Sequence, residues 1–224
     1  MGLPRFAVVD VETSGLRPKR HHVLQIGLVV VEADGTVVDR WSTLVRLRRF
    51  WHRVGPRHVH GITRRSLRDA AHAAEAFDEL RRRIDGAVFT AHNAKFDAEF
   101  IDRAAQRAGV TLRVEPRLCT LDLSRRLDPE RLLTHGLADV CGRYAIPLVD
   151  HHDALADATA TAAVLPLLLR DLGITEATQL DELYFPRRRP VAASNEGQGT
   201  FRTEGLVPFI PGAPEMEGAR PTER

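Results

Sequence analysis

The stretch RFAVVDVETSGL, residues Arg5–Leu16, joins a strand pattern to a pair of acids. Its first seven residues, Arg5–Val11, are mostly apolar and β-branched, which is typical of a buried strand. A second such run, VLQIGLVVV at Val23–Val31, contains no charged residue. Near-continuous hydrophobicity of this kind predicts strands that are covered on both faces of a sheet.

The remaining chain continues with strand and helix patterns. A third strand is expected at Thr36–Leu47, after a turn at Ala33–Gly35. Downstream, we expect strands at Ala87–Ala91 and Val114–Asp122, the latter running into a helix, and helices at Ser66–Ile84, Asp97–Ala108, Gly136–Tyr144 and Ala154–Leu172. Three strands followed by alternation predict an α/β domain with a mixed central sheet.

The chain's 224 residues suit one domain with a tail. The composition changes near Pro186, because the last 39 residues hold six of the 13 prolines and five glycines. We therefore expect a domain over residues 1–185 and an extended or disordered tail over residues 186–224. The apolar patch Leu206–Ile210 in this tail is expected to dock on its own domain, and alternatively on a partner.

Several classes of protein are disfavoured by composition. No apolar run approaches the roughly 20 residues that a membrane span needs, and the N-terminus lacks the features of a secretory signal. The only two cysteines, Cys119 and Cys141, argue against a disulfide scaffold or a cysteine zinc cluster. We expect both to be buried packing residues in a protein of the reducing cytoplasm.

The segment from Arg46 to Arg68 is unusually basic in a chain whose net charge is only +2. It contains eight arginines and no acid, with Phe50 and Trp51 between them. Such a stripe attracts phosphates, and its aromatic rings can stack on bases. The alternative is a solvated basic loop.

Two acids end the first predicted strand. Strand alternation places Asp10 and Glu12 on one face, where they repel each other. A divalent cation would relieve this repulsion, and carboxylate oxygens suit Mg²⁺ or Mn²⁺. The alternative is a pair of acids that cap loops. The small polar turn Thr13–Gly15 that follows would let a ligand approach the backbone.

Two further clusters carry acids beside histidines. In HNAKFD, His92–Asp97, the acid Asp97 opens a predicted helix, where an acid also complements the helix dipole. In HHDALADA, the acid Asp157 lies on a helix otherwise rich in Ala and Leu, and His152 precedes it in the entering loop. A loop histidine is able to take a proton. Asp153 is expected as the helix N-cap and His151 as a solvated neighbour.

Together these motifs resemble those of a known enzyme family. The matching stretches are VVDVETSGL (Val8–Leu16), HGIT (His60–Thr63), HNAKFD (His92–Asp97), CTLDLSRRL (Cys119–Leu127) and HDALADA (His152–Ala158). In this order they resemble the histidine branch of the DEDD superfamily of 3′–5′ exonucleases. The likeness is greatest to the epsilon, or proofreading, subunit of bacterial DNA polymerase III and its stand-alone relatives. It covers roughly residues 5–172. The tyrosine branch is excluded, because Asp153 stands four residues before Asp157.

The resemblance implies a ribonuclease-H-like fold, with a five-stranded mixed sheet flanked by helices. It also implies two divalent cations, Mg²⁺ or Mn²⁺, and His152 as a histidine general base. The product implied by the resemblance is a nucleoside 5′-monophosphate. The implied metal ligands are Asp10, Glu12, Asp97 and Asp157. The implied contacts to the terminal nucleotide are Thr13, Ser14, Gly15, Leu16, His60, Asn93 and Phe96. Leu16 and Phe96 are alternatively core residues, and His60 alternatively fixes a loop.

The expected activity is trimming of single-stranded DNA 3′ ends, in proofreading or repair, with RNA as the second substrate. A catalytically silent polymerase-docking subunit is a different reading, which the complete set of four acids and a histidine argues against. A phosphodiesterase for other substrates is disfavoured by the arginine stripe. The segment Gln179–Phe185 faintly resembles a sliding-clamp peptide with one extra residue, and is alternatively the amphipathic end of the domain.

Overall fold

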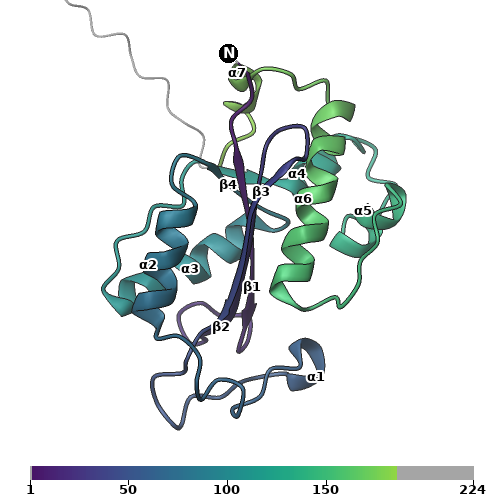
Figure 1. The fold of residues 1–224 in the computed structure, drawn as a ribbon. Coiled ribbons are helices and arrows are strands. Elements are labelled where there is room, and N and C mark those ends of the chain that lie inside the picture. The colour runs from purple at the N-terminus through teal and green to yellow at the C-terminus, as the bar shows by residue number, and fades with distance from the viewer. Residues whose placement is uncertain (1, 186–224) are drawn as a thin grey trace, which may run out of the picture. The chain divides into compact units, whose positions relative to one another are not determined.

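A five-stranded sheet forms the centre of the fold in the computed structural model, which describes residues 2–185 (Figure 1). The tail prediction for residues 186–224, including Leu206–Ile210, lies outside the described residues. The strands are β1 (Phe6–Thr13), β2 (Val23–Val31), β3 (Val37–Leu44), β4 (Val88–Ala91) and β5 (Arg117–Cys119). They are ordered β3-β2-β1-β4-β5, with β1, β2 and β3 antiparallel and β1, β4 and β5 parallel. The expected mixed sheet is confirmed.

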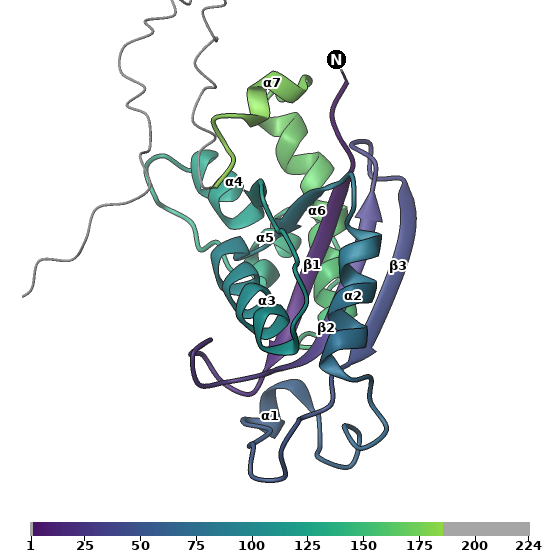
Figure 2. The ribbon, with the colours of Figure 1, turned by 90° about the vertical axis from the view of Figure 1, so that its left-hand side faces the viewer.

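Helices cover both faces of this sheet (Figure 1). One face carries α2 (Ala73–Arg83) and α3 (Ala94–Ala108), and the other carries α4 (Thr120–Arg126), α5 (Leu137–Arg143) and α6 (Ala154–Asp171). Two four-residue helices, α1 (Arg57–His60) and α7 (Ala177–Leu180), complete the fold. Figure 2 shows α1 and its flanking loops beyond the end of β1.

Strand alternation in β1 decides on which face the acids lie. Ala7, Val9 and Val11 pack into the core under α2 and α3, whereas Phe6 and Val8 pack into the core under α6. Because successive side chains point to opposite faces, Asp10 and Glu12 follow Phe6 and Val8 onto the α6 face.

The first turn of α6 lies directly against the backbone of β2. A Cβ atom at Gly27 would be only 2.2 Å from the carbonyl carbon of Ala154, so this contact requires glycine. Gly27 pairs in register with Asp10. The absent side chain therefore lets α6 approach the sheet beside Asp10.

Gln25 fixes the same junction through its amide. Its Nε2 donates to Asp153 Oδ2 at 2.7 Å, and its Oε1 accepts from the Ala154 N–H at 3.4 Å. Asp153 in turn accepts from the N–H groups of Leu155 and Ala156, as expected of an N-cap. Neither Gln25 nor Gly27 was singled out in the sequence, although a polar residue and a glycine within an apolar strand are visible signals.

One predicted boundary is wrong by seven residues. The helix expected over Ser66–Ile84 begins only at Ala73. Thr63 and Ser66 instead hold a turn through reciprocal side-chain hydrogen bonds. The helix starts where His72 and Glu75 form a capping box, a local signal stronger than the apolar spacing.

The last described segment closes the domain. Leu180 and Tyr184 are buried in the core under α6, and the Phe185 backbone exchanges two hydrogen bonds with Arg117 of β5. Burial of Leu180 and Tyr184 favours the alternative interpretation of Gln179–Phe185 over a sliding-clamp peptide. The segment is the amphipathic end of the domain.

Cys119 and Cys141 are buried free thiols, as expected. Over residues 2–185, no helix combines the length and apolar character that crossing a membrane requires.

Candidate active site

Three carboxylates meet on the α6 face of the sheet. Asp10 and Glu12 come from β1, and Asp157 comes from the first turn of α6. One oxygen of each lies within 4.8 Å of the others. A cluster of hard oxygen donors at this spacing suits a divalent cation such as Mg²⁺ or Mn²⁺.

Asp97 supplies the fourth carboxylate from the first turn of α3. It is buried, and its Oδ1 accepts a hydrogen bond from the Val11 N–H at 3.2 Å. Val11 lies between Asp10 and Glu12, so this bond ties α3 to the acid-bearing part of β1. The structure thus brings together the four carboxylates singled out in the sequence.

The electrostatics of this acid cluster (Asp10, Glu12, Asp97 and Asp157) favour a bound cation. Burial, followed by the charges of Asp97 and Asp157, raises the pKa of Asp10 well above its usual range. Burial, followed by the charge of Asp157, raises the pKa of Glu12 to about 8. Burial raises the pKa of Asp97 to about 7. These carboxylates resist ionisation together, and a divalent cation would offset that resistance.

The raised pKa values predict how the metal-free protein responds to pH. Carboxyl groups whose pKa is higher in the folded than in the unfolded state hold extra protons when folded, so their contribution to stability is lost as pH rises. For Asp97 and Glu12 that loss runs from about pH 4 to about pH 8. In chelator, scanning calorimetry should show the Tm falling between about pH 7 and pH 8, above the range in which histidines with a lowered pKa, such as His22 and His92, add stability as pH rises.

Added Mg²⁺ should raise the Tm more at pH 8 than at pH 5, because protonated carboxylates bind cations poorly. An equal rise at both pH values would contradict the assignment of these acids as cation ligands.

Two histidines stand at the open side of the cluster. His151 Nδ1 is 2.9 and 3.0 Å from the two oxygens of Asp157, and the His152 N–H donates to Asp157 Oδ2 at 3.3 Å. The two rings stack with their centroids 3.9 Å apart. His151, expected as a solvated neighbour, is exposed as predicted but also contacts Asp157, a contact that no sequence spacing indicated.

The backbone at these histidines is strained. Asp150 has φ = 55° and His152 has φ = 75°, a left-handed conformation that costs a non-glycine residue of order 1 kcal/mol or more. Strained residues of this kind concentrate at functional sites, where the surrounding structure holds them in place. Here the strain turns His152 so that its N–H reaches Asp157.

The turn after β1 forms one rim of the site. The Thr13 hydroxyl donates to the Gly15 carbonyl, and Ser14 Oγ accepts from the His22 N–H. Gly15 has φ = 151°, a backbone conformation that other residues rarely adopt, and a Cβ there would also lie 2.7 Å from the His21 ring, so the position favours glycine. Leu16 is 79% exposed, which rules out its alternative role as a core residue.

The other predicted contact residues occupy different environments. Asn93 is exposed before α3, whereas Phe96 is half-buried against Phe100 and the core. His60 is 8% exposed, and its Nδ1 accepts from the Ile62 N–H, which fixes the loop. Its Nε2 is buried with no hydrogen-bond partner among residues 2–185. Burial chiefly lowers the pKa of His60, and the charge of nearby His152 lowers it further.

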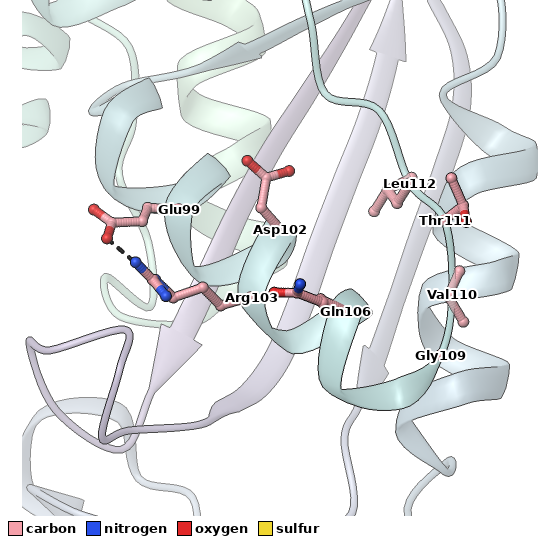
Figure 3. A pocket seen from close by; sticks show the side chains of 8 residues that line it. All are labelled: Glu99, Asp102, Arg103, Gln106, Gly109, Val110, Thr111 and Leu112. Atoms are coloured by element: carbon pink, nitrogen blue, oxygen red, sulfur yellow. Dashed lines mark hydrogen bonds and ion pairs between the residues drawn. The ribbon is translucent and has the colours of Figure 1, made fainter. Parts of the chain in front are cut away.

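A hollow away from the acid cluster lies on the face of α3 opposite Asp97, near the loop that follows the helix. Figure 3 shows the residues that line this hollow. Its charged groups are paired, since Glu99 pairs with Arg103 at 3.3 Å and Asp102 pairs with Arg117 of β5 at 2.8 Å. This hollow holds none of the residues singled out in the sequence.

Comparison with known proteins places the chain in a family. Residues 7–165 match the family model described as an exonuclease, RNase T. The chain is 32% identical over 220 residues to the PolC-type DNA polymerase III of Halalkalibacterium halodurans, covering 96% of this chain and 14% of that polymerase. The chain thus spans about one seventh of the length of that curated relative.

Solved structures agree on the fold. E. coli exonuclease I in complex with a dT13 oligonucleotide has a TM-score of 0.67 and 20% identity, covering 76% of this chain and 42% of that chain. Exonuclease X in complex with 5′ overhanging duplex DNA has a TM-score of 0.58 and 25% identity, covering 80% of this chain and 98% of that one. These matches confirm the ribonuclease-H-like expectation for the sheet and its helices. With its family model, its PolC-type relative and this fold, the chain belongs to the RNase T exonuclease family.

Proposed function

We propose that the chain is a metal-dependent 3′–5′ exonuclease that removes nucleoside 5′-monophosphates from the 3′ ends of single-stranded DNA. The observation that carries this proposal is the meeting of Asp10, Glu12 and Asp157 within 4.8 Å, beside two histidines. Membership of an exonuclease family and the DNA-bound exonucleases I and X support nucleic acid as the substrate.

The acid cluster would hold two divalent cations, Mg²⁺ or Mn²⁺. Asp10 would contribute to both cations, Glu12 and Asp157 to one, and Asp97 to the other. When bound, such cations supply Lewis-acid stabilisation of the phosphodiester under attack. Without them, four carboxylates would repel the scissile phosphate.

The remaining steps belong to side chains of this protein. His152 would accept the proton of the attacking water as general base, from its position beside Asp157. Leu16, exposed on the rim, would press against the terminal base, with Phe96 nearby. The Thr13–Gly15 turn, Asn93 and His60 would contact the sugar and phosphate of the terminal nucleotide.

The PolC-type relative supports proofreading as one setting for this activity, and free-standing repair trimming is the other. A polymerase partner would supply DNA synthesis in the first setting.

The proposal is tested with single strands of matched sequence, DNA and RNA, labelled at either end. With Mg²⁺ or Mn²⁺, 5′-labelled DNA should shorten stepwise, whereas 3′-labelled DNA should release its label first as a mononucleotide. The reverse pattern of labels would contradict the polarity. Faster shortening of RNA would contradict DNA as the preferred substrate.

A further inference from the structure

The segment from Arg46 to Arg68, the arginine segment, carries positive charge that the domain does not neutralise. All eight of its arginines are exposed. Among residues 2–185, none of these eight forms an ion pair with a carboxylate, whereas the arginines of α2 pair with Asp78, Glu79 or Asp39. A row of exposed, unpaired cations attracts a polyanion from outside the domain.

Cavities in this segment are lined by the same arginines. One of about 510 Å³ is bordered by Arg46, Arg48, Arg64, Arg65 and Arg68 together with Leu47, Phe50 and Leu67. A second, of about 800 Å³, is bordered by three arginines of the segment, by Arg107 of α3 and by three histidines, with no acid in its lining. Burial, followed by the charges of Arg49 and Arg64, lowers the pKa of His52, which lines the second cavity.

Two aromatic rings project from the middle of the segment. Phe50 is 82% exposed and Trp51 is 57% exposed, and their rings meet edge to face at 4.8 Å. The Arg49 guanidinium lies 4.9 Å from the centre of the Trp51 ring. Exposed rings flanked by guanidinium groups offer stacking surfaces for unpaired bases and hydrogen-bond donors for phosphates.

The segment is continuous with the candidate active site. A Cβ at Gly55 would lie 2.4 Å from the Ser14 carbonyl oxygen, so the segment packs directly on the turn after β1. His60, the last residue of α1 within this segment, is close enough to His152 for the two side chains to interact electrostatically. Five Cα–Cα steps lead from Phe50 to Gly55, which limits their separation to about 18 Å. A strand leaving the acid cluster would reach the rings within a few nucleotides.

From these observations we infer that the arginine segment is a second binding site for the substrate, holding unpaired nucleotides upstream of the terminal one by phosphate contacts and by stacking on Phe50 and Trp51. The inference rests on the proposed function for its choice of a single-stranded polynucleotide. It adds a requirement for length, since a substrate of one or two nucleotides would not reach the segment.

The binding test needs no catalysis. Anisotropy of a 5′-fluorescein oligothymidylate, in chelator, is measured with Phe50→Ala/Trp51→Ala and with Arg65→Glu/Arg68→Glu. Each variant should weaken binding about tenfold or more. The arginine variant should also flatten the salt dependence by about 0.7 for each phosphate that the protein no longer neutralises. Arg65→Lys/Arg68→Lys should retain most of the affinity.

The matched control is Arg40→Glu/Arg170→Glu, which makes the same change in net charge at exposed positions on β3 and at the far end of α6. It should change affinity less than twofold. Equal losses in the control and in the arginine variant, or no loss in either segment variant, would overturn the inference. So would displacement of the strand by polyglutamate as effectively as by unlabelled oligothymidylate, which would favour an acidic polypeptide as the partner.

A kinetic test separates the segment from the acid cluster. The nitrophenyl ester of thymidine 5′-monophosphate would reach only the acid cluster, so both segment variants should hydrolyse it at the wild-type rate. On the oligothymidylate their KM should rise. Equal loss on the small ester and on the strand would show that the substitutions disturb the catalytic site, and would contradict a separate binding site. A wild-type protein that binds the strand but hydrolyses neither substrate would contradict the proposed function while supporting the inference.

Discussion

Replacing Asp10 with Asn should reduce turnover by about 1000-fold or more while the fold is retained. Asp10 lies at the centre of the acid cluster, where burial, followed by the charges of Asp97, Asp157 and Glu12, raises its pKa. Asn has nearly the same size but no charge, and it presents one amide in place of a carboxylate oxygen. Loss of a central cation ligand removes several kcal/mol of transition-state stabilisation, which corresponds to this decrease in rate.

The same substitution should stabilise the metal-free protein. Asparagine does not ionise, so folding no longer requires residue 10 to take up a proton or to bury a charge beside the other acids, and the Tm in chelator should rise by about 2–4 °C, equivalent to about 1 kcal/mol for a domain of this size. Mg²⁺ should raise the Tm of the variant less than that of the wild type. The matched control is Asp181→Asn, an exposed acid after α7, at the opposite end of the domain from α1 (Figure 1). Its turnover and Tm should equal those of the wild type.

Wild-type turnover by Asp10→Asn would contradict the metal-site assignment. A variant that is inactive and also less stable in chelator would show that Asp10 has a structural role instead.

Replacing His152 with Ala should lower kcat by about 100- to 10,000-fold, the usual contribution of a general base. Its backbone N–H, and not its ring, donates a hydrogen bond to Asp157, and alanine keeps that N–H. Affinity for Mn²⁺, measured by calorimetric titration, should therefore change little. Added imidazole should restore part of the missing rate, because it replaces the absent ring.

His151→Ala is the matched control for this prediction. His151 contacts both oxygens of Asp157 through Nδ1, so its removal should alter cation affinity more than the chemical step. If His151→Ala loses the rate and is rescued by imidazole while His152→Ala keeps its rate, the base is His151. That result would overturn the assignment of His152.

The features that the sequence predicted well depend on local pattern. The bounds of β2 were correct because Val23–Val31 is an unbroken run of apolar or small residues, with Gln25 as its one exception. Such a run is typical of a strand covered on both faces. Asp10 and Glu12 share a face because strand alternation requires it. The helix Ala154–Leu172 was correct at its N-terminus because Asp153 is a strong N-cap.

The features that the sequence did not reveal depend on approaches between distant segments. Gly27 matters because its backbone meets Ala154, more than 120 residues later in the chain. The sequence shows how many residues separate His151 and His152 from Asp157, but not that both reach this carboxylate. Their contact with Asp157 becomes visible only in the structure, where the loop at Asp150 and His152 is strained. Sequence periodicity carries no information about such approaches.

The most direct test of metal-dependent attack at a 3′ end compares a linear 5′-labelled DNA strand with the same strand closed into a circle. Each is incubated with the purified protein in Mg²⁺ and in chelator. The linear strand should shorten stepwise from its 3′ end in Mg²⁺ only, and the circle should remain intact. Cleavage of the circle, or shortening of the linear strand in chelator, would contradict an exonuclease that acts through the acid cluster and its cations.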